Sequence, residues 1–101
     1  MTDFVTGVCR ALAHPVRRAL LQSLSSGECD VGHLCTGREL DQPTVSKHLA
    51  ALRRAGLVQA RVDGPRRCYS LLHEDTVRQL LALLDQLESE EISSCPRPSG
   101  G

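Results

Sequence analysis

The feature that most restricts the fold is an amphipathic helix with clear start and stop signals, followed at once by a hairpin. Residues 44–55 carry apolar side chains at helical spacing, namely Val45, Leu49 and Leu52. Asp41 precedes this segment and suits a helix N-cap, while Gly56 follows it and suits a left-handed stop. The pattern predicts a short helix with one face in the core and the other exposed.

Two strands are predicted directly after this helix, at residues 57–62 and 67–72, joined by a turn around Asp63-Gly64-Pro65. The remaining helices are predicted at residues 4–12, 16–24, 31–40 and 76–92. A short helix, a turn, a second helix and a hairpin with a cationic tip form a winged helix-turn-helix. We therefore expect a mainly α fold with a small β-hairpin, with residues 1–92 as one domain and residues 93–101 as a disordered tail.

The charges are distributed unevenly although the net charge is zero. Residues 42–72 hold six basic side chains and one acidic, or +5, whereas residues 1–41 sum to −1 and residues 73–101 to −4. A local basic surface can face phosphate while the rest of the molecule stays away from it. The alternative interpretation is a solvated charged face with no ligand.

The helix at 44–55 is the candidate recognition helix, and the hairpin is the candidate wing. Hydroxyl, amide and cationic side chains at these places could reach base edges and phosphates. The candidate DNA-binding residues are Gln42, Thr44, Ser46, Lys47, His48, Arg54, Arg66 and Arg67. A winged helix that binds protein is a second hypothesis, which the basic middle third disfavours. No catalytic motif is present, so an enzyme is not expected.

Three stretches resemble the ArsR/SmtB family of transcriptional repressors. They are Ala11-Leu-Ala-His-Pro-Val-Arg-Arg, the segment from Gln42 to Val58 that contains Thr-Val-Ser-Lys-His-Leu, and the arginine-rich hairpin that ends in Tyr69-Ser-Leu. The resemblance implies an α-α-α-α-β-β-α homodimer that binds palindromic double-stranded operator DNA and leaves it when an inducer binds. It also implies a dimer interface made by the first and last helices, which an apolar stripe in the last helix supports. The candidate interface residues are Val5, Val8, Leu12, Val77, Leu80, Leu81, Leu84 and Leu87.

The inducer is expected to be a thiophilic metal or metalloid, because the chain has five cysteines and the family's arsenic branch binds through thiolates near the third helix. Cys35 matches a family cysteine directly, and Cys29 lies one residue away from another. As(III) or Sb(III) takes three soft ligands. Cys29 and Cys35 would supply two of them, and Cys9 or Cys95 the third. No organic cofactor is expected.

Other interpretations of the cysteines remain open. Cys9 and Cys95 could form a redox or persulfide pair between the interface helices, and Cys35 could be a small core residue. A zinc site of the family's last-helix type is disfavoured, because that part of the chain offers a single histidine, His73. No apolar run is long enough to cross a bilayer, and no signal peptide is recognisable. The protein is therefore expected in the cytoplasm, without a membrane partner.

Overall fold

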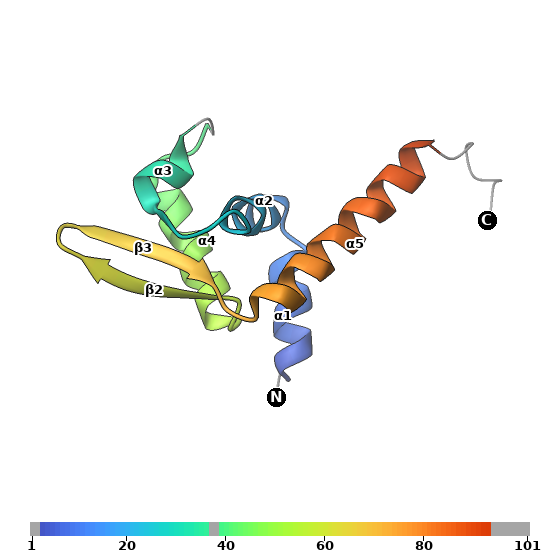
Figure 1. Ribbon diagram of the computed structural model, residues 1–101, viewed down its shortest axis with the longest axis horizontal. Coiled ribbons are helices and arrows are strands. Elements are labelled where there is room, and N and C mark those ends of the chain that lie inside the picture. The colour runs from blue at the N-terminus through green and yellow to red at the C-terminus, as the bar shows by residue number, and fades with distance from the viewer. Residues whose placement is uncertain (1–2, 37–38, 94–101) are drawn as a thin grey trace.

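A computed structural model describes residues 3–36 and 39–93 of the chain, with side chains described up to residue 90. These residues form five helices and three short strands (Figure 1). In chain order they are α1 Phe4–Leu12, α2 Pro15–Leu24, β1 Cys29–Asp30, α3 Val31–Cys35, α4 Gln42–Arg54, β2 Val58–Asp63, β3 Arg66–Leu71 and α5 Glu74–Ser93. The predicted fold class, mainly α with a small hairpin, is confirmed.

The hydrophobic core forms where α2 and α4 meet the base of the sheet. Most of its large, completely buried side chains come from these two helices, and Leu34 of α3 and Val58 of β2 are the others. Those of α2 and α4 are Leu20, Leu21, Leu24, Val45, Leu49 and Leu52. The apolar face predicted for the fourth helix is therefore confirmed. Asp41 is the N-cap of α4, since its carboxylate accepts a hydrogen bond from the backbone N–H of Thr44 at 3.0 Å. Hydrogen bonding to Thr44 lowers the pKa of this carboxyl.

The third helix is shorter than predicted. It ends at Cys35 instead of residue 40, because Thr36 turns to an extended backbone with ψ 128°. Asp30 caps its start by accepting a hydrogen bond from the backbone N–H of His33 at 2.7 Å. Leu40 is half-buried and packs against the core from outside any helix, which explains why the apolar pattern overestimated the length.

A third strand, β1, was missed by the sequence reasoning. Cys29 pairs with Tyr69 and Asp30 with Cys68, so β1 extends the hairpin to an antiparallel sheet of order β1-β3-β2. Two residues are too few to show an alternating pattern. The hairpin itself is confirmed, with its strands shifted by one residue and its closing pair at Asp63 and Arg66.

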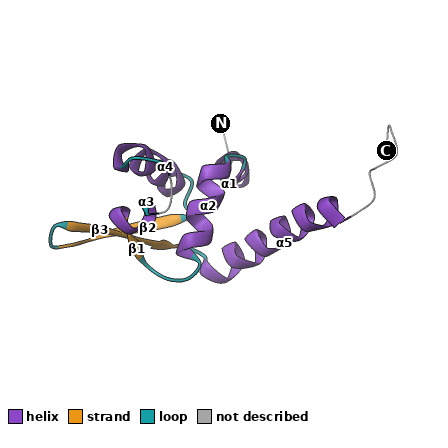
Figure 2. Cartoon of the chain, turned by 90° about the horizontal axis from the view of Figure 1, so that it is seen from above, coloured by secondary structure: helices purple, strands orange, loops and turns teal. Residues whose placement is uncertain are grey.

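Helix α5 begins on the core and then extends away from the rest of the protein (Figures 1 and 2). Val77 and Leu81 are each only 3% exposed and belong to the core of their own protomer. The inner turns of α5 are thus covered within one protomer, and a role of these two residues in a dimer interface stays a prediction. Farther along the helix, Leu83 is 60% exposed and Leu87 is 63% exposed. Val5 on α1 is similarly exposed, at 67%.

The other candidate interface residues are less exposed: Val8, Leu12, Leu80 and Leu84 are half-buried. Ser93 is the last residue of α5, and the rest of the predicted tail, residues 94–101, lies outside the described residues. Within the described part of the chain, no helix is both long and apolar enough to cross a membrane.

Truncation of Leu49 tests the dependence of the fold on the α2–α4 contact. Leu49→Ala leaves a cavity in a completely buried site, so we expect the free energy of unfolding to fall by about 2–5 kcal/mol. Urea denaturation followed by circular dichroism measures this change. Lys47→Ala, on the exposed side of the same helix, should change it by less than about 0.5 kcal/mol. Equal effects of the two substitutions would contradict the assignment.

Candidate nucleic-acid interface

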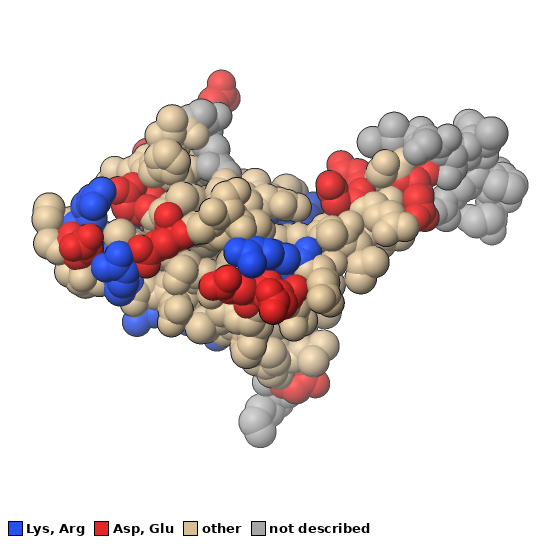
Figure 3. Space-filling model, viewed as in Figure 1, with Lys and Arg blue, Asp and Glu red and all other residues tan. Residues whose placement is uncertain are grey.

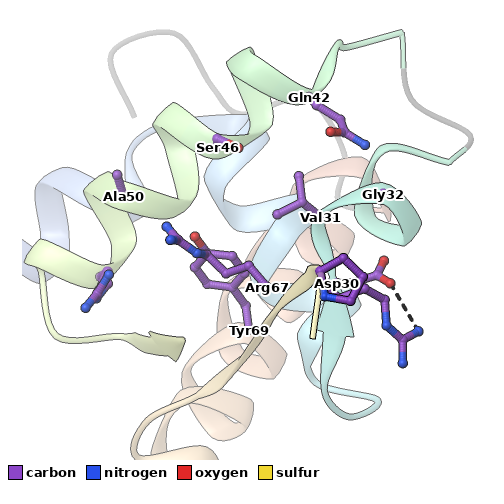
Figure 4. Close-up of a pocket in the computed structure, with 11 residues that line it drawn as sticks. Asp30, Val31, Gly32, Gln42, Ser46, Ala50, Arg67 and Tyr69 are labelled. Atoms are coloured by element: carbon purple, nitrogen blue, oxygen red, sulfur yellow. Dashed lines mark ion pairs between the residues drawn. The ribbon is translucent and has the colours of Figure 1, made fainter. Parts of the chain in front are cut away.

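One side of α4 faces the wing and the start of α3 across a groove of about 480 Å³ (Figure 4). The side of α4 next to its core face supplies four lining residues at helical spacing, which are Gln42, Ser46, Ala50 and Arg53. The start of α3 supplies Asp30, Val31 and Gly32, and the wing supplies Pro65, Arg66, Arg67 and Tyr69. The groove therefore joins elements that are far apart in the sequence around one exposed helix face.

Four of the predicted DNA-binding residues line this groove, namely Gln42, Ser46, Arg66 and Arg67. The side chain of Gln42 approaches the start of α3, since a Cβ added at Gly32 would lie 3.6 Å from its Nε2. Arg53 was not among the predicted DNA-binding residues. It lies eleven residues after Gln42, which places it on the same side of the helix as Gln42 and Ser46, and this spacing was visible in the sequence.

The other predicted DNA-binding residues lie outside the groove lining. Lys47 and Arg54 are exposed on α4, while Thr44 is half-buried in its first turn. Exposed cations can meet phosphates whether they line the groove or lie beside it, whereas the amide of Gln42 and the hydroxyl of Ser46 suit base edges.

His48 packs against α2 instead of pointing outward. Its ring centroid lies 4.5 Å from that of His14, and its Nδ1 accepts a hydrogen bond from Arg17 Nε at 3.3 Å. Burial lowers the pKa of His48 from its ordinary value of 6.5, and the positive charges of His14, Arg17 and Lys47 lower it further. The structure thus places His48 in the α2–α4 contact, where its neutral form is favoured.

Ion pairs occupy part of the basic surface of the wing. Arg61 donates two hydrogen bonds to the carboxylate of Glu28, at 2.6 and 2.7 Å, and these bonds lower the pKa of that carboxyl. Arg66 lies 3.6 Å from Asp30 and 3.7 Å from Asp63. Figure 3 accordingly shows acidic and basic side chains next to each other at the wing end of the molecule.

Several basic side chains have no carboxylate partner within the part of the chain that the structure describes. Among the described residues, no carboxylate lies within 4.0 Å of the charged groups of Lys47, Arg53, Arg54 or Arg67. Two of these, Arg53 on α4 and Arg67 on the wing, line the groove. Within residues 42–72, the cations without a described carboxylate partner are therefore those on α4 and one position of the wing.

The cysteines occupy different environments. Cys29 and Cys35 are half-buried and pack against the core, Cys68 is buried, and Cys9 is exposed on α1. Cys95 lies outside the described residues. The described part of one protomer contains no group of three or more His, Cys, Asp or Glu side chains that could hold a metal ion. Cys29 and Cys35 therefore do not form a three-ligand site with other described residues of the same protomer.

Comparison with known proteins finds relatives of this chain by sequence and by fold. The family model described as bacterial regulatory protein, arsR family, matches residues 14–60, which run from the start of α2 into β2. The homodimeric winged helix-turn-helix DNA-binding domain of a Mycobacterium bovis protein has the same fold, with a TM-score of 0.79 at 34% identity. That match covers 95% of this chain and 88% of the other.

Two curated regulators are also similar. The biofilm growth-associated repressor of Agrobacterium fabrum is 38% identical over 74 residues, which are 73% of this chain and 63% of that protein. An HTH-type transcriptional regulator of Mycobacterium tuberculosis is 36% identical over 93 residues, which are 92% of this chain and 41% of that protein. The chain thus spans less than two thirds of the length of these two relatives.

The environment of His48 predicts a pH dependence of stability. Because the lowered pKa makes the folded protein bind this proton less readily than the unfolded chain does, stability is complete above about pH 6.5 and decreases as the pH falls below it. In His48→Gln, thermal unfolding between pH 7.5 and 5 should depend less on pH. His33→Gln, which changes an exposed histidine on α3, is the control and should keep the wild-type pH dependence.

Proposed function

The chain belongs to the ArsR family of bacterial regulatory proteins, and on that premise we propose that it is a transcriptional repressor that binds double-stranded operator DNA as a homodimer. The family model and the relatives are those of DNA-binding regulators and not of enzymes. The name of the Agrobacterium relative supports repression as the direction of control.

The observation that carries this proposal is the row of α4 facing a groove that is lined by Arg53 of α4 and by Arg67 of the wing. The amide of Gln42 can pair with an adenine edge, and the Ser46 hydroxyl can donate or accept. Arg53 and Arg67 can hold the phosphates that flank such contacts. The described helix and wing together therefore offer both base-reading and backbone-binding groups.

Dimerisation follows from the apolar side chains that the protomer leaves uncovered. Phe4 and Val5 on α1 are 58% and 67% exposed, and Leu83 and Leu87 on α5 are similarly exposed. A second copy that covers these faces removes apolar surface from water. Two recognition helices in a symmetric dimer fit half-sites about one helical turn apart, so we propose a palindromic operator with two protomers bound.

Release of DNA is proposed to be controlled at Cys29 and Cys35, with As(III), Sb(III) or another thiophilic metal ion as inducer. A three-thiolate site would need a ligand in addition to these two, either Cys9 of a second copy or Cys95. The position of Cys29 supports a link to the wing, because β1 consists of Cys29 and Asp30 and pairs directly with β3. A displacement of Cys29 would disturb the pairing of β1 with Tyr69 and Cys68.

A thiol-based redox or persulfide switch is the second candidate. The exposure of Cys9 on α1 favours it, since an exposed thiol is accessible to oxidants. The proposed partner of Cys9 is Cys95, which lies outside the described residues. The two candidates share the fold and the DNA interface, and they differ in which cysteines the inducer needs.

Substitution of adjacent arginines tests the DNA interface. Arg53→Ala should weaken binding to operator and random duplexes by a similar factor and reduce the slope of log K against log salt by about one per protomer, because a phosphate contact is lost. Arg54→Ala is the matched control, since Arg54 lies outside the groove lining, and it should have the smaller effect. Fluorescence anisotropy on labelled duplexes measures both. A larger effect of Arg54→Ala would place the DNA on another face of α4.

The inducer is tested on the complex of the reduced protein with DNA from upstream of its coding region. We expect arsenite to release the DNA, and we expect Cys29→Ser and Cys35→Ser to abolish this release without weakening DNA binding. Zinc and a polysulfide are added in parallel. Release by polysulfide alone, lost in Cys9→Ser, would reject the metalloid and favour the redox switch. Tight DNA binding without any response would retain the repressor and reject both inducers.

A further inference from the structure

Asp30 uses its two carboxylate oxygens for different elements. Oδ1 accepts the hydrogen bond from the backbone N–H of His33 at 2.7 Å and so caps α3. Oδ2 lies 3.6 Å from a guanidinium nitrogen of Arg66 on the wing, an ion pair drawn as a dashed line in Figure 4. The side chain of Asp30 is only 24% exposed and lines the groove. One carboxylate therefore joins the start of α3 to the tip of the wing.

The two arginines at the wing tip differ in what surrounds them. Arg66 lies between Asp30 and Asp63, at 3.6 and 3.7 Å. Arg67 also lines the groove, but no carboxylate of the described residues lies within 4.0 Å of its guanidinium. A phosphate that enters the groove can pair with Arg67 directly, whereas at Arg66 it must compete with carboxylates that are already in place.

A phosphate can displace Asp30 from Arg66, but the affinity of the protein for that phosphate is then reduced. The side chain of Arg66 is 62% exposed, and exposed ion pairs are weak because water screens them. When a phosphate takes Arg66, the pair with Asp30 is lost and a carboxylate remains next to the phosphate. This loss depends on the DNA backbone and not on the base sequence.

We propose that Asp30 is a residue that limits the DNA affinity of this protein by holding Arg66, without affecting which sequence is preferred. The proposal rests on the DNA-binding function proposed above. Breaking an exposed ion pair of ordinary strength corresponds to roughly a 1.4- to 5-fold change in affinity. A homodimer contains the pair twice, so the combined change is roughly 2- to 25-fold.

Asp30→Asn in the full chain separates the charge from the cap. The amide oxygen of asparagine can still accept the hydrogen bond from His33, since Asn caps helices as well as Asp, while the negative charge toward Arg66 is lost. We expect tighter binding to a random duplex and to the upstream operator duplex, by the same factor within the range above. The salt dependence should become steeper by about one counterion per protomer.

The double variant Asp30→Asn/Arg66→Ala identifies the route of the effect. If Asp30 acts by holding Arg66, the gain in affinity disappears in the Arg66→Ala background. A gain that persists there would indicate long-range repulsion between Asp30 and DNA and would overturn the proposal. Asp85→Asn removes an acidic charge from the outer part of α5, far along the chain from the groove, and it should leave both affinities unchanged.

Three further outcomes would also reject the proposal. Weaker binding of Asp30→Asn, with unchanged thermal stability, would mean that Asp30 positions Arg66 for DNA instead of withholding it. A change confined to the operator duplex would mean that Asp30 acts on sequence recognition. Unchanged affinity would mean that the ion pair does not compete with DNA. Failure of the wild-type protein to bind any duplex would instead reject the DNA-binding function itself, and this inference with it.

Discussion

The packing of α4 against α2 determines where the rest of the molecule can act. Leu49 and its apolar neighbours on α4 are completely buried against the leucines of α2, so the rotation of α4 about its axis is fixed by its core side. The row that contains Gln42, Ser46 and Arg53, next to this core side, then has to face the groove and the wing. A helix of thirteen residues would not hold this orientation by propensity alone, and burial supplies the difference.

Local signals predicted most of the fold, because caps, periodic apolar residues and turn residues act over a few positions. Asp41 and Gly56 bracket α4 as expected, and the hairpin closes near Gly64. The misses come from tertiary contacts. Leu40 is apolar without being helical, and β1 exists because β3 offers it a pairing edge.

The candidate site was predictable in composition but not in detail. The basic middle of the chain marked the surface, yet a count of charges does not show which ones are paired. Arg61 and Arg66 are held by carboxylates from the segment before α3 and from the turn of the wing, while Arg53 and Arg67 have no such partner among the described residues. His48 illustrates the same limit, because its partner His14 is distant in the sequence and its contact with α2 is visible only in three dimensions.

Because α5 projects beyond the rest of the protomer, it also acts as a lever arm: a small change in its direction produces a large displacement of its outer end. A helix of 20 residues is about 30 Å long, so a tilt of about 10° where it leaves the core displaces its outer end by about 5 Å. Val77 and Leu81 seat the inner end of this arm in the same core that orients α4. In a dimer joined through two such helices, a slight repacking near the core would change the distance between the two recognition helices. The spacing of the half-sites is fixed by the helical repeat of DNA, so the changed dimer would fit them less well.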